Sequence, residues 1–184
     1  MAVDPRHLQR AADLTDGLSE WTGRGIAWLT LAMVLVQFAV VVLRYGFSFG
    51  SIALQESVTY LHALVFMLGV AYTLKREGHV RVDVFYRRMG DRGRAWVDLF
   101  GTLVLLLPTF VFILVISWTF VANSWLRMEG SPETGGLPLV FLLKSVIVVM
   151  PVLMLVQGLS MAARNLLVLM GHGTTPRGGG EVEV

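Results

Sequence analysis

The stretch that decides the fold is Gly25–Leu43, GIAWLTLAMVLVQFAVVVL, a run of 19 residues without a charged side chain. A helix of about 20 apolar residues matches the hydrocarbon thickness of a bilayer, so this run predicts a transmembrane helix. The preceding segment mixes Arg6, Arg10 and Arg24 with acidic residues and has no small-residue cleavage site. We therefore expect the helix to be retained rather than removed as a signal peptide.

Three further apolar runs follow, at about 52–74, 96–122 and 137–161. The chain has 184 residues, of which 55% are hydrophobic and only 15% are charged, and four spans account for this excess of apolar side chains. We expect an all-α integral membrane protein with four transmembrane helices, folded as one domain over residues 1–170. Residues 171–184, rich in glycine, are expected to form a disordered cytoplasmic tail.

Basic residues are distributed unevenly between the two sides of these spans. Twelve of the fifteen Lys and Arg residues lie before the first span, between the second and third, or after the fourth. The opposite side has Arg44 and Arg127, and Lys144 lies within the fourth run. Because basic loops stay in the cytoplasm, both termini and the 75–95 loop are predicted to be cytoplasmic. The aromatic residues of this loop favour lipid, and we expect no nucleic acid as a partner.

Two segments outside the spans have amphipathic patterns. Leu14, Leu18 and Trp21 recur at helical spacing, which predicts an interfacial helix before the first span. A similar apolar pattern in the 75–95 loop predicts a second interfacial helix on anionic lipid. The basic residues of that loop that we assign to the lipid surface are Arg76, Arg81, Arg87 and Arg88. The alternative is a plain loop whose charges simply follow the topology rule.

Charged groups at membrane depth usually face a partner, a cavity or water. Glu56 lies roughly 6 Å into the second span from the external side, and Lys144 roughly 10 Å into the fourth. Arg44 ends the first span at the same surface. Matched depth and opposite sign predict that Glu56 pairs with Lys144 or with Arg44. The alternative is that Lys144 extends outward and Glu56 faces water at the helix end.

The second span also has a polar face, formed by Gln55, Thr59 and His62 together with Phe66. We expect this face to point at protein rather than lipid, packing against another helix or lining a substrate path. His62 is the one histidine within a span, and the chain has no cysteine. We therefore expect no catalytic residue, no metal site and no cofactor.

Three motifs, in this order, carry a resemblance. The first runs from Arg44-Tyr45-Gly46-Phe47 to Leu54-Gln55-Glu56, and the second is REGHVRVD at 76–83. The third starts with ETGGLP at 133–138 and continues through Lys144 and Pro151 to QGL at 157–159. Over about residues 20–165 the chain resembles the small, DctQ-like membrane subunit of tripartite ATP-independent periplasmic (TRAP) transporters.

The resemblance implies a transport function without catalysis. A periplasmic solute-binding protein would capture a solute, usually a carboxylate, and a large many-span permease subunit would move it inward with a sodium gradient. The small subunit would brace the large one and help the binding protein to dock. The family often has a tryptophan and two adjacent acids where this chain has Leu54, Gln55 and Glu56, which puts in doubt any ion pair that needs both acids.

Two other classes of function stay open at this stage. One is a small membrane enzyme for quinone or lipid chemistry that would use Glu56 and His62, although six residues of helix place these roughly 120° apart. The other is a standalone membrane assembly factor. Co-purification with a large membrane partner separates both from the transporter subunit.

Overall fold

The computed structural model describes residues 5–75, 86 and 89–171, and within them every regular element is helical. The helices are α1 (Pro5–Gly46), α2 (Ile52–Lys75), α4 (Asp91–Gly101), α5 (Leu107–Leu126) and α6 (Val140–Leu169), with a π-helical turn η1 (Thr102–Leu106) between α4 and α5. Four of these stretches are long and apolar enough to cross a membrane, namely Trp21–Gly46, Ile52–Leu74, Asp91–Leu126 and Val140–Leu169. The prediction of four spanning helices is confirmed.

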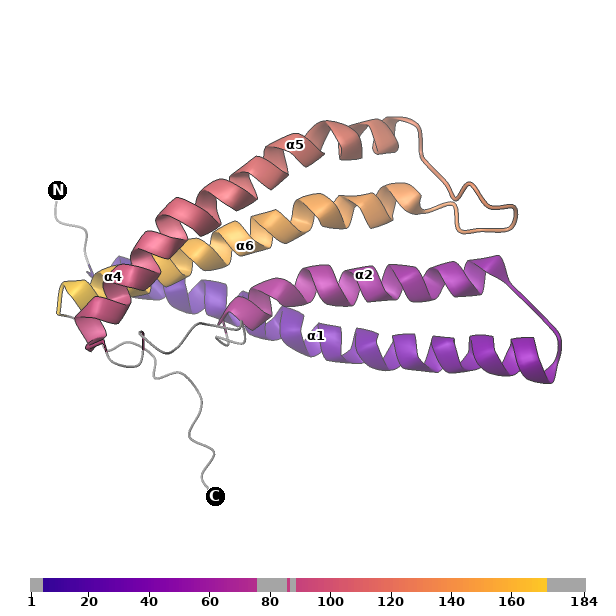
Figure 1. Cartoon of the computed structure of the whole chain (residues 1–184), viewed down its shortest axis with the longest axis horizontal. Coiled ribbons are helices and arrows are strands. Elements are labelled where there is room, and N and C mark those ends of the chain that lie inside the picture. Colours follow the sequence, from indigo (N-terminus) through magenta and orange to yellow (C-terminus); the bar gives the residue numbers. More distant parts are fainter. Residues whose placement is uncertain (1–4, 76–85, 87–88, 172–184) are drawn as a thin grey trace, which may run out of the picture.

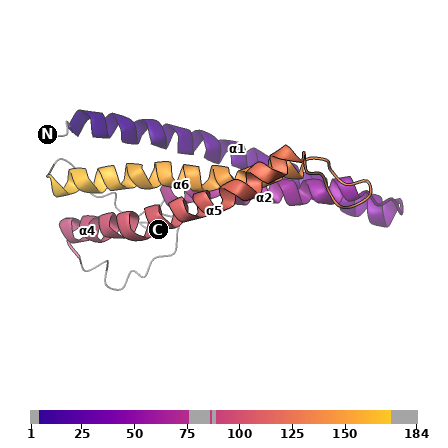
Figure 2. The ribbon, with the colours of Figure 1, turned by 90° about the horizontal axis from the view of Figure 1, so that it is seen from above.

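The helices form two hairpins (Figure 1). Helices α1 and α2 pair with each other, and α5 pairs with α6. Helix α6 is the central element, because it also packs against α1, α2 and α4. The first residues of α1 and α4 and the last residues of α2 and α6 gather at one end of the molecule (Figures 1 and 2). The other end, which we call the hairpin end, consists of the connections 47–51 and 127–139.

The bounds of three spans differ from those predicted, and the first extends from Trp21 to Gly46 rather than over 25–43. The third span begins at Asp91 and ends at Leu126, longer at both ends than the predicted 96–122. The fourth begins at Val140 rather than 137 and continues to Leu169. The delayed start has a local cause: the backbone of Leu137 is hydrogen-bonded within the connection 127–139 instead of entering the helix.

The predicted interfacial helix before the first span is helical, but it is not a separate element. Residues from Pro5 continue without interruption into the spanning part of α1. No proline follows Pro5 in this helix, and the glycines at 17, 23 and 25 do not interrupt it. The second predicted interfacial helix and the residues Arg76, Arg81, Arg87 and Arg88 lie outside the described residues.

The third span contains a wide turn next to Pro108. The N–H of Leu107 donates to the carbonyl of Thr102, five residues earlier, which is the pattern of a π-bulge. Proline cannot donate to the preceding turn and crowds its carbonyls, and a wide turn relieves this crowding. At this level Gly158 of α6 approaches so closely that a Cβ there would lie 2.5 Å from Leu106 Cδ2 and 3.3 Å from Leu107 Cδ2.

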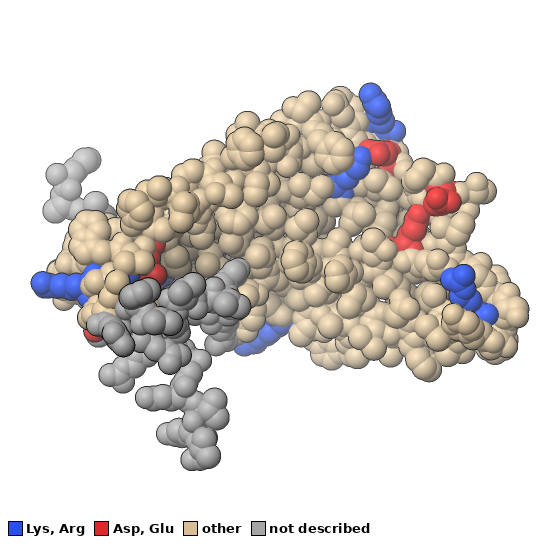
Figure 3. Space-filling model, viewed as in Figure 1, with Lys and Arg blue, Asp and Glu red and all other residues tan. Residues whose placement is uncertain are grey.

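On the face drawn in Figure 3, most charged side chains lie toward the two ends of the molecule, with one basic patch at the lower edge between them. Few side chains are buried inside the chain: the spanning window of α1 has none, whereas α6 has the largest share, 22%. A surface of this kind is suited to lipid and to other membrane helices rather than to water.

Candidate functional site: a junction at the hairpin end

Glu56 connects the two hairpins. Its Oε2 atom accepts a hydrogen bond from the backbone N–H of Leu137 at 2.6 Å, and its Oε1 atom accepts one from the hydroxyl of Ser131. Glu56 belongs to the first turns of α2, whereas its two donors belong to the connection between α5 and α6. One carboxylate therefore ties the α1–α2 hairpin to the α5–α6 hairpin at the end where the ribbons spread apart (Figure 1).

The connection is folded to present these donors. The N–H of Ser131 donates to the carbonyl of Leu137 at 3.0 Å, and the N–H of Gly136 donates to the carbonyl of Glu133 at 3.0 Å. Gly135 has a φ of +83°, which side chains with a Cβ rarely adopt. A Cβ at Gly136 would lie 2.8 Å from Glu56 Oε1. The same Cβ would meet the side chain of Ser131 even more closely. The two glycines of ETGGLP therefore have separate tasks: one makes the turn, and the other leaves room for the Ser131 hydroxyl and the carboxylate that accepts it.

Lys144 pairs with Glu129, not with Glu56. The Nζ atom of Lys144 lies 2.7 Å from Oε1 and 2.6 Å from Oε2 of Glu129, and 4.2 Å from the ring centroid of Phe120. The predicted pairing of Glu56 with Lys144 is therefore wrong. The count from residue 137 placed Lys144 too far along the helix, because α6 begins at Val140. The connection 127–139 also folds back and places its own carboxylate, Glu129, beside Lys144. The backbone N–H of Phe141 donates to the carbonyl of Glu129 and fixes this return.

The ion pair has an electrostatic consequence for Glu129. The hydrogen bond from Lys144 lowers the pKa of the Glu129 carboxyl below its ordinary value, and the positive charges of Lys144 and Arg127 add to this effect. The carboxylate thus stays ionised when the pH falls below the usual carboxyl range. Sequence reasoning missed Glu129, although its position directly after the third span was a usable signal.

An aromatic pair supports the same connection. The indole Nε1 of Trp125 donates to the hydroxyl of Ser145 at 2.7 Å, and its ring packs edge-on against Phe141 with centroids 4.8 Å apart. These contacts join the last turn of α5 to the first turns of α6. Together with the ion pair and the Glu56 hydrogen bonds, they hold the hairpin end as one structured unit.

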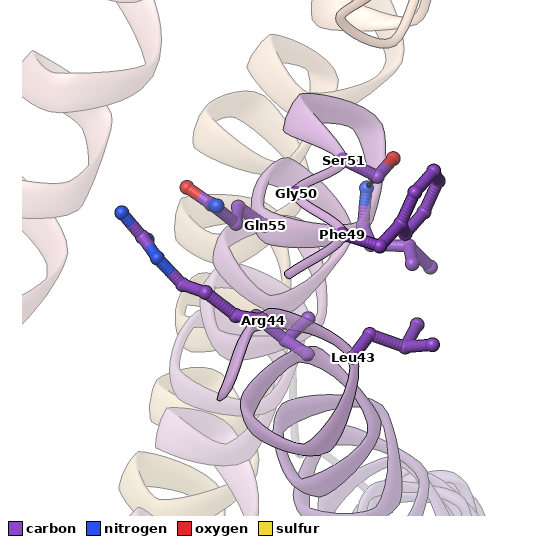
Figure 4. Close-up of a pocket in the computed structure, with 8 residues that line it drawn as sticks. Leu43, Arg44, Phe49, Gly50, Ser51 and Gln55 are labelled. Atoms are coloured by element: carbon purple, nitrogen blue, oxygen red, sulfur yellow. Dashed lines mark hydrogen bonds between the residues drawn. The ribbon is translucent and has the colours of Figure 1, made fainter. Parts of the chain in front are cut away.

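Arg44, the other predicted partner of Glu56, lies at the edge of a hollow between α1 and α2 (Figure 4). Its guanidinium and the amide of Gln55 extend toward the same side, out of the hairpin. Within the described residues Arg44 is exposed, and no ion pair with Glu56 is formed. The predicted Glu56–Arg44 pair is therefore not made either.

The polar face of α2 points away from the rest of the chain. Gln55, Thr59, His62 and Phe66 are all exposed. The rings of His62 and Phe66 stack nearly parallel, with an interplanar angle of 8° and centroids 6.4 Å apart. None of the helices in the described part of the chain covers this face, which leaves it open to packing against another molecule.

The polar groups of the junction are engaged in contacts that hold the hairpin end together. Glu56 uses both oxygens on the connection 127–139, while His62 faces outward. Among residues 5–75, 86 and 89–171, no three His, Cys, Asp or Glu side chains gather as a metal site would require.

The fold and its junction define a small four-helix membrane protein in which the polar face of α2 is exposed. The chain belongs to the DctQ component family of tripartite ATP-independent periplasmic transporters, whose family model matches residues 33–168. It is therefore a TRAP transporter small permease subunit, a multi-pass membrane protein.

Two curated relatives are similar to it. A Vibrio cholerae C4-dicarboxylate TRAP transporter small permease protein, DctQ, is 28% identical over 130 residues, which cover 68% of this chain and 54% of the relative. A Haemophilus influenzae putative TRAP transporter small permease protein is 29% identical over 117 residues, 61% of this chain and 67% of that protein. The chain thus spans about half the length of the Vibrio relative. No solved structure matches the chain significantly.

Proposed function

We propose that this subunit braces a large many-span permease during sodium-driven uptake of a carboxylate-type solute delivered by a periplasmic binding protein. The subunit carries no reaction step of its own. Its contribution is a rigid body in the membrane against which the larger, moving subunit works. Both termini and the 75–95 loop lie in the cytoplasm, and the hairpin end faces the periplasm.

The observation that carries this proposal is the Glu56 junction. A brace has to keep its shape while its partner moves, and two helical hairpins joined only by apolar contacts can slide in lipid, where no hydrophobic driving force holds helices together. The hydrogen bonds from Ser131 and Leu137 to Glu56 cross between the hairpins and resist such sliding.

Three further points support the proposal. Membership of the DctQ component family supports a role as one subunit of a transporter. The Vibrio relative is named as part of a C4-dicarboxylate transporter, which agrees with a carboxylate-type solute. The distribution of basic residues supports the orientation, because Arg and Lys gather in the loops at the end opposite to the hairpin end.

Co-purification tests the proposal. The tagged chain is expressed with a large TRAP permease subunit from the same genome, solubilised in mild detergent and isolated through its tag. We expect the large permease to be recovered in a fixed ratio to this chain. Recovery of the intact, folded chain without the permease, under conditions where both are present in the membrane, would overturn the proposal.

A further inference from the structure

The exposed side of α2 differs in chemistry from the exposed side of α6. Every exposed position of α2 lies on one stripe with spacings of three and four residues: Ile52, Gln55, Thr59, His62 and Phe66. At 3.6 residues per turn these positions fall within an arc of roughly 80°. The remaining surface of α2 packs against α1 and α6. Three of the five side chains that face outward are polar.

Helix α6 provides the comparison within the same chain. Its exposed positions are Leu142, Val149, Val152, Leu159 and Leu166. All five are aliphatic, as expected for a surface in contact with lipid tails. Since both helices span the membrane, the difference indicates that the stripe on α2 meets an environment other than lipid.

The position of His62 along the spanning helix strengthens this argument. His62 lies ten residues after the first residue of α2, or about 15 Å along the helix, which is close to the middle of a hydrocarbon core of about 30 Å. Within the described residues, the side chains of Gln55, Thr59 and His62 have no hydrogen-bond partner. An imidazole left without a partner at that depth is costly, so the partner of His62 has to come from another molecule.

We propose that this stripe, Ile52 to Phe66 on α2, is the docking surface for a spanning helix of the large permease subunit, which presents hydrogen-bonding side chains to Gln55 and His62. This inference rests on the proposed function, because the transporter supplies the partner. The spacing supports it: alternating steps of three and four residues form the seam along which two helices interlock. The seam would begin beside Arg44 and Gln55, at the edge of the hollow in Figure 4.

Site-specific crosslinking tests the surface, since the chain has no cysteine and a single introduced thiol is unique in it. Thr59→Cys and Phe66→Cys place the thiol on the stripe, and Val152→Cys and Leu159→Cys place it on the aliphatic side of α6. Each tagged variant is labelled in the membrane with a maleimide–benzophenone in the presence of the large permease and irradiated. The wild-type chain, which has no cysteine, is the control: any adduct that it forms must come from label attached to the permease.

We expect the two α2 variants to form an adduct with the mass of this chain plus the permease, at several times the yield of the two α6 variants. An adduct of twice the mass of this chain from the α2 sites would identify a second copy as the occupant and overturn the proposal. Permease adducts that form equally or preferentially from the α6 sites would also overturn it. The proposed function would stand in both cases, provided that wild-type chain still co-purifies with the permease.

A binding measurement gives independent support. The double substitution Gln55→Leu/His62→Leu removes the polar groups but keeps an apolar helix, and we expect the permease to bind roughly tenfold more weakly. The matched control Leu142→Val/Leu159→Val changes the other exposed side and should leave binding unchanged. Unaltered binding by Gln55→Leu/His62→Leu would contradict the docking surface.

Discussion

The carboxylate of Glu56 accepts the backbone N–H of Leu137 at 2.6 Å, although 81 residues separate the two in the chain. The same carboxylate accepts the hydroxyl of Ser131. This relationship joins the second span to the connection between the third and fourth. It explains why the segment that begins ETGGLP folds as it does, and why an acid stands four residues after the start of α2.

The two substitutions Glu56→Ala and Glu56→Gln should have different effects. Alanine removes both acceptors and leaves the N–H of Leu137 without its partner, which costs stability. Glutamine keeps one carbonyl oxygen for that N–H, and its amide can donate to Ser131. We therefore expect a clear fall in the unfolding temperature for Glu56→Ala and a small one for Glu56→Gln, measured on the purified protein in detergent. Equal losses would show that charge, rather than hydrogen bonding, is what the junction needs.

The substitution Gly136→Ala should loosen the junction although Glu56 itself is left in place. The added Cβ would lie 2.8 Å from Glu56 Oε1, so either the carboxylate or the connection has to move. The matched control is Gly50→Ala in the other connection of the hairpin end, where a Cβ meets nothing within 4 Å. We expect faster protease cleavage within 127–139 for Gly136→Ala only. Identical cleavage rates in the two variants would contradict the close approach seen here.

The Lys144–Glu129 pair should make stability depend on acid pH. Because the pKa of Glu129 is lowered in the folded protein, its contribution is fully present above the ordinary carboxyl pKa, which is near 4.5, and is lost as pH falls through the lowered pKa. The unfolding temperature of the wild-type protein should therefore decline over that acidic range. Glu129→Gln should show a lower unfolding temperature at neutral pH and a flatter decline. A decline of the same size in wild type and Glu129→Gln would exclude this pair as its source.

Two glycines of α1, two residues apart, should respond in opposite directions to alanine. At Gly23 a Cβ would lie 2.5–2.9 Å from the ring of Tyr72 on α2, whereas at Gly25 it meets nothing within 4 Å. Gly23→Ala should cost about 1–3 kcal/mol through overpacking of α1 against α2. Gly25→Ala should gain about 0.5–1 kcal/mol from better helix propensity. Denaturant titration of both variants measures the difference, and a stabilising Gly23→Ala would show that the helices can separate freely.

The sequence was sufficient for the four spans because a long uncharged run has few alternatives to a membrane helix. Helical spacing also predicts that Gln55, Thr59 and His62 share one side of α2, and all three side chains are exposed. The sequence failed for the partner of Glu56. Depth in the membrane is a one-dimensional property, and the actual partners, Ser131 and the N–H of Leu137, depend on how a 13-residue connection folds back.

Other features had no reliable sequence signal. The π-bulge before Pro108 is recognised only from its backbone hydrogen bond, because a proline in the sequence is equally compatible with a simple kink. The continuity of α1 from Pro5 was missed since an amphipathic pattern next to an apolar one suggests two helices, while the backbone has no reason to break between them.

Solute uptake in a reconstituted system tests the central claim most directly. Proteoliposomes contain the large permease with or without this chain, are supplied with the binding protein and its solute, and receive an inward sodium gradient. We predict solute accumulation when this chain is present and only background uptake when it is left out. Equal uptake by the permease alone, with this chain adding nothing, would contradict its role as an obligatory brace.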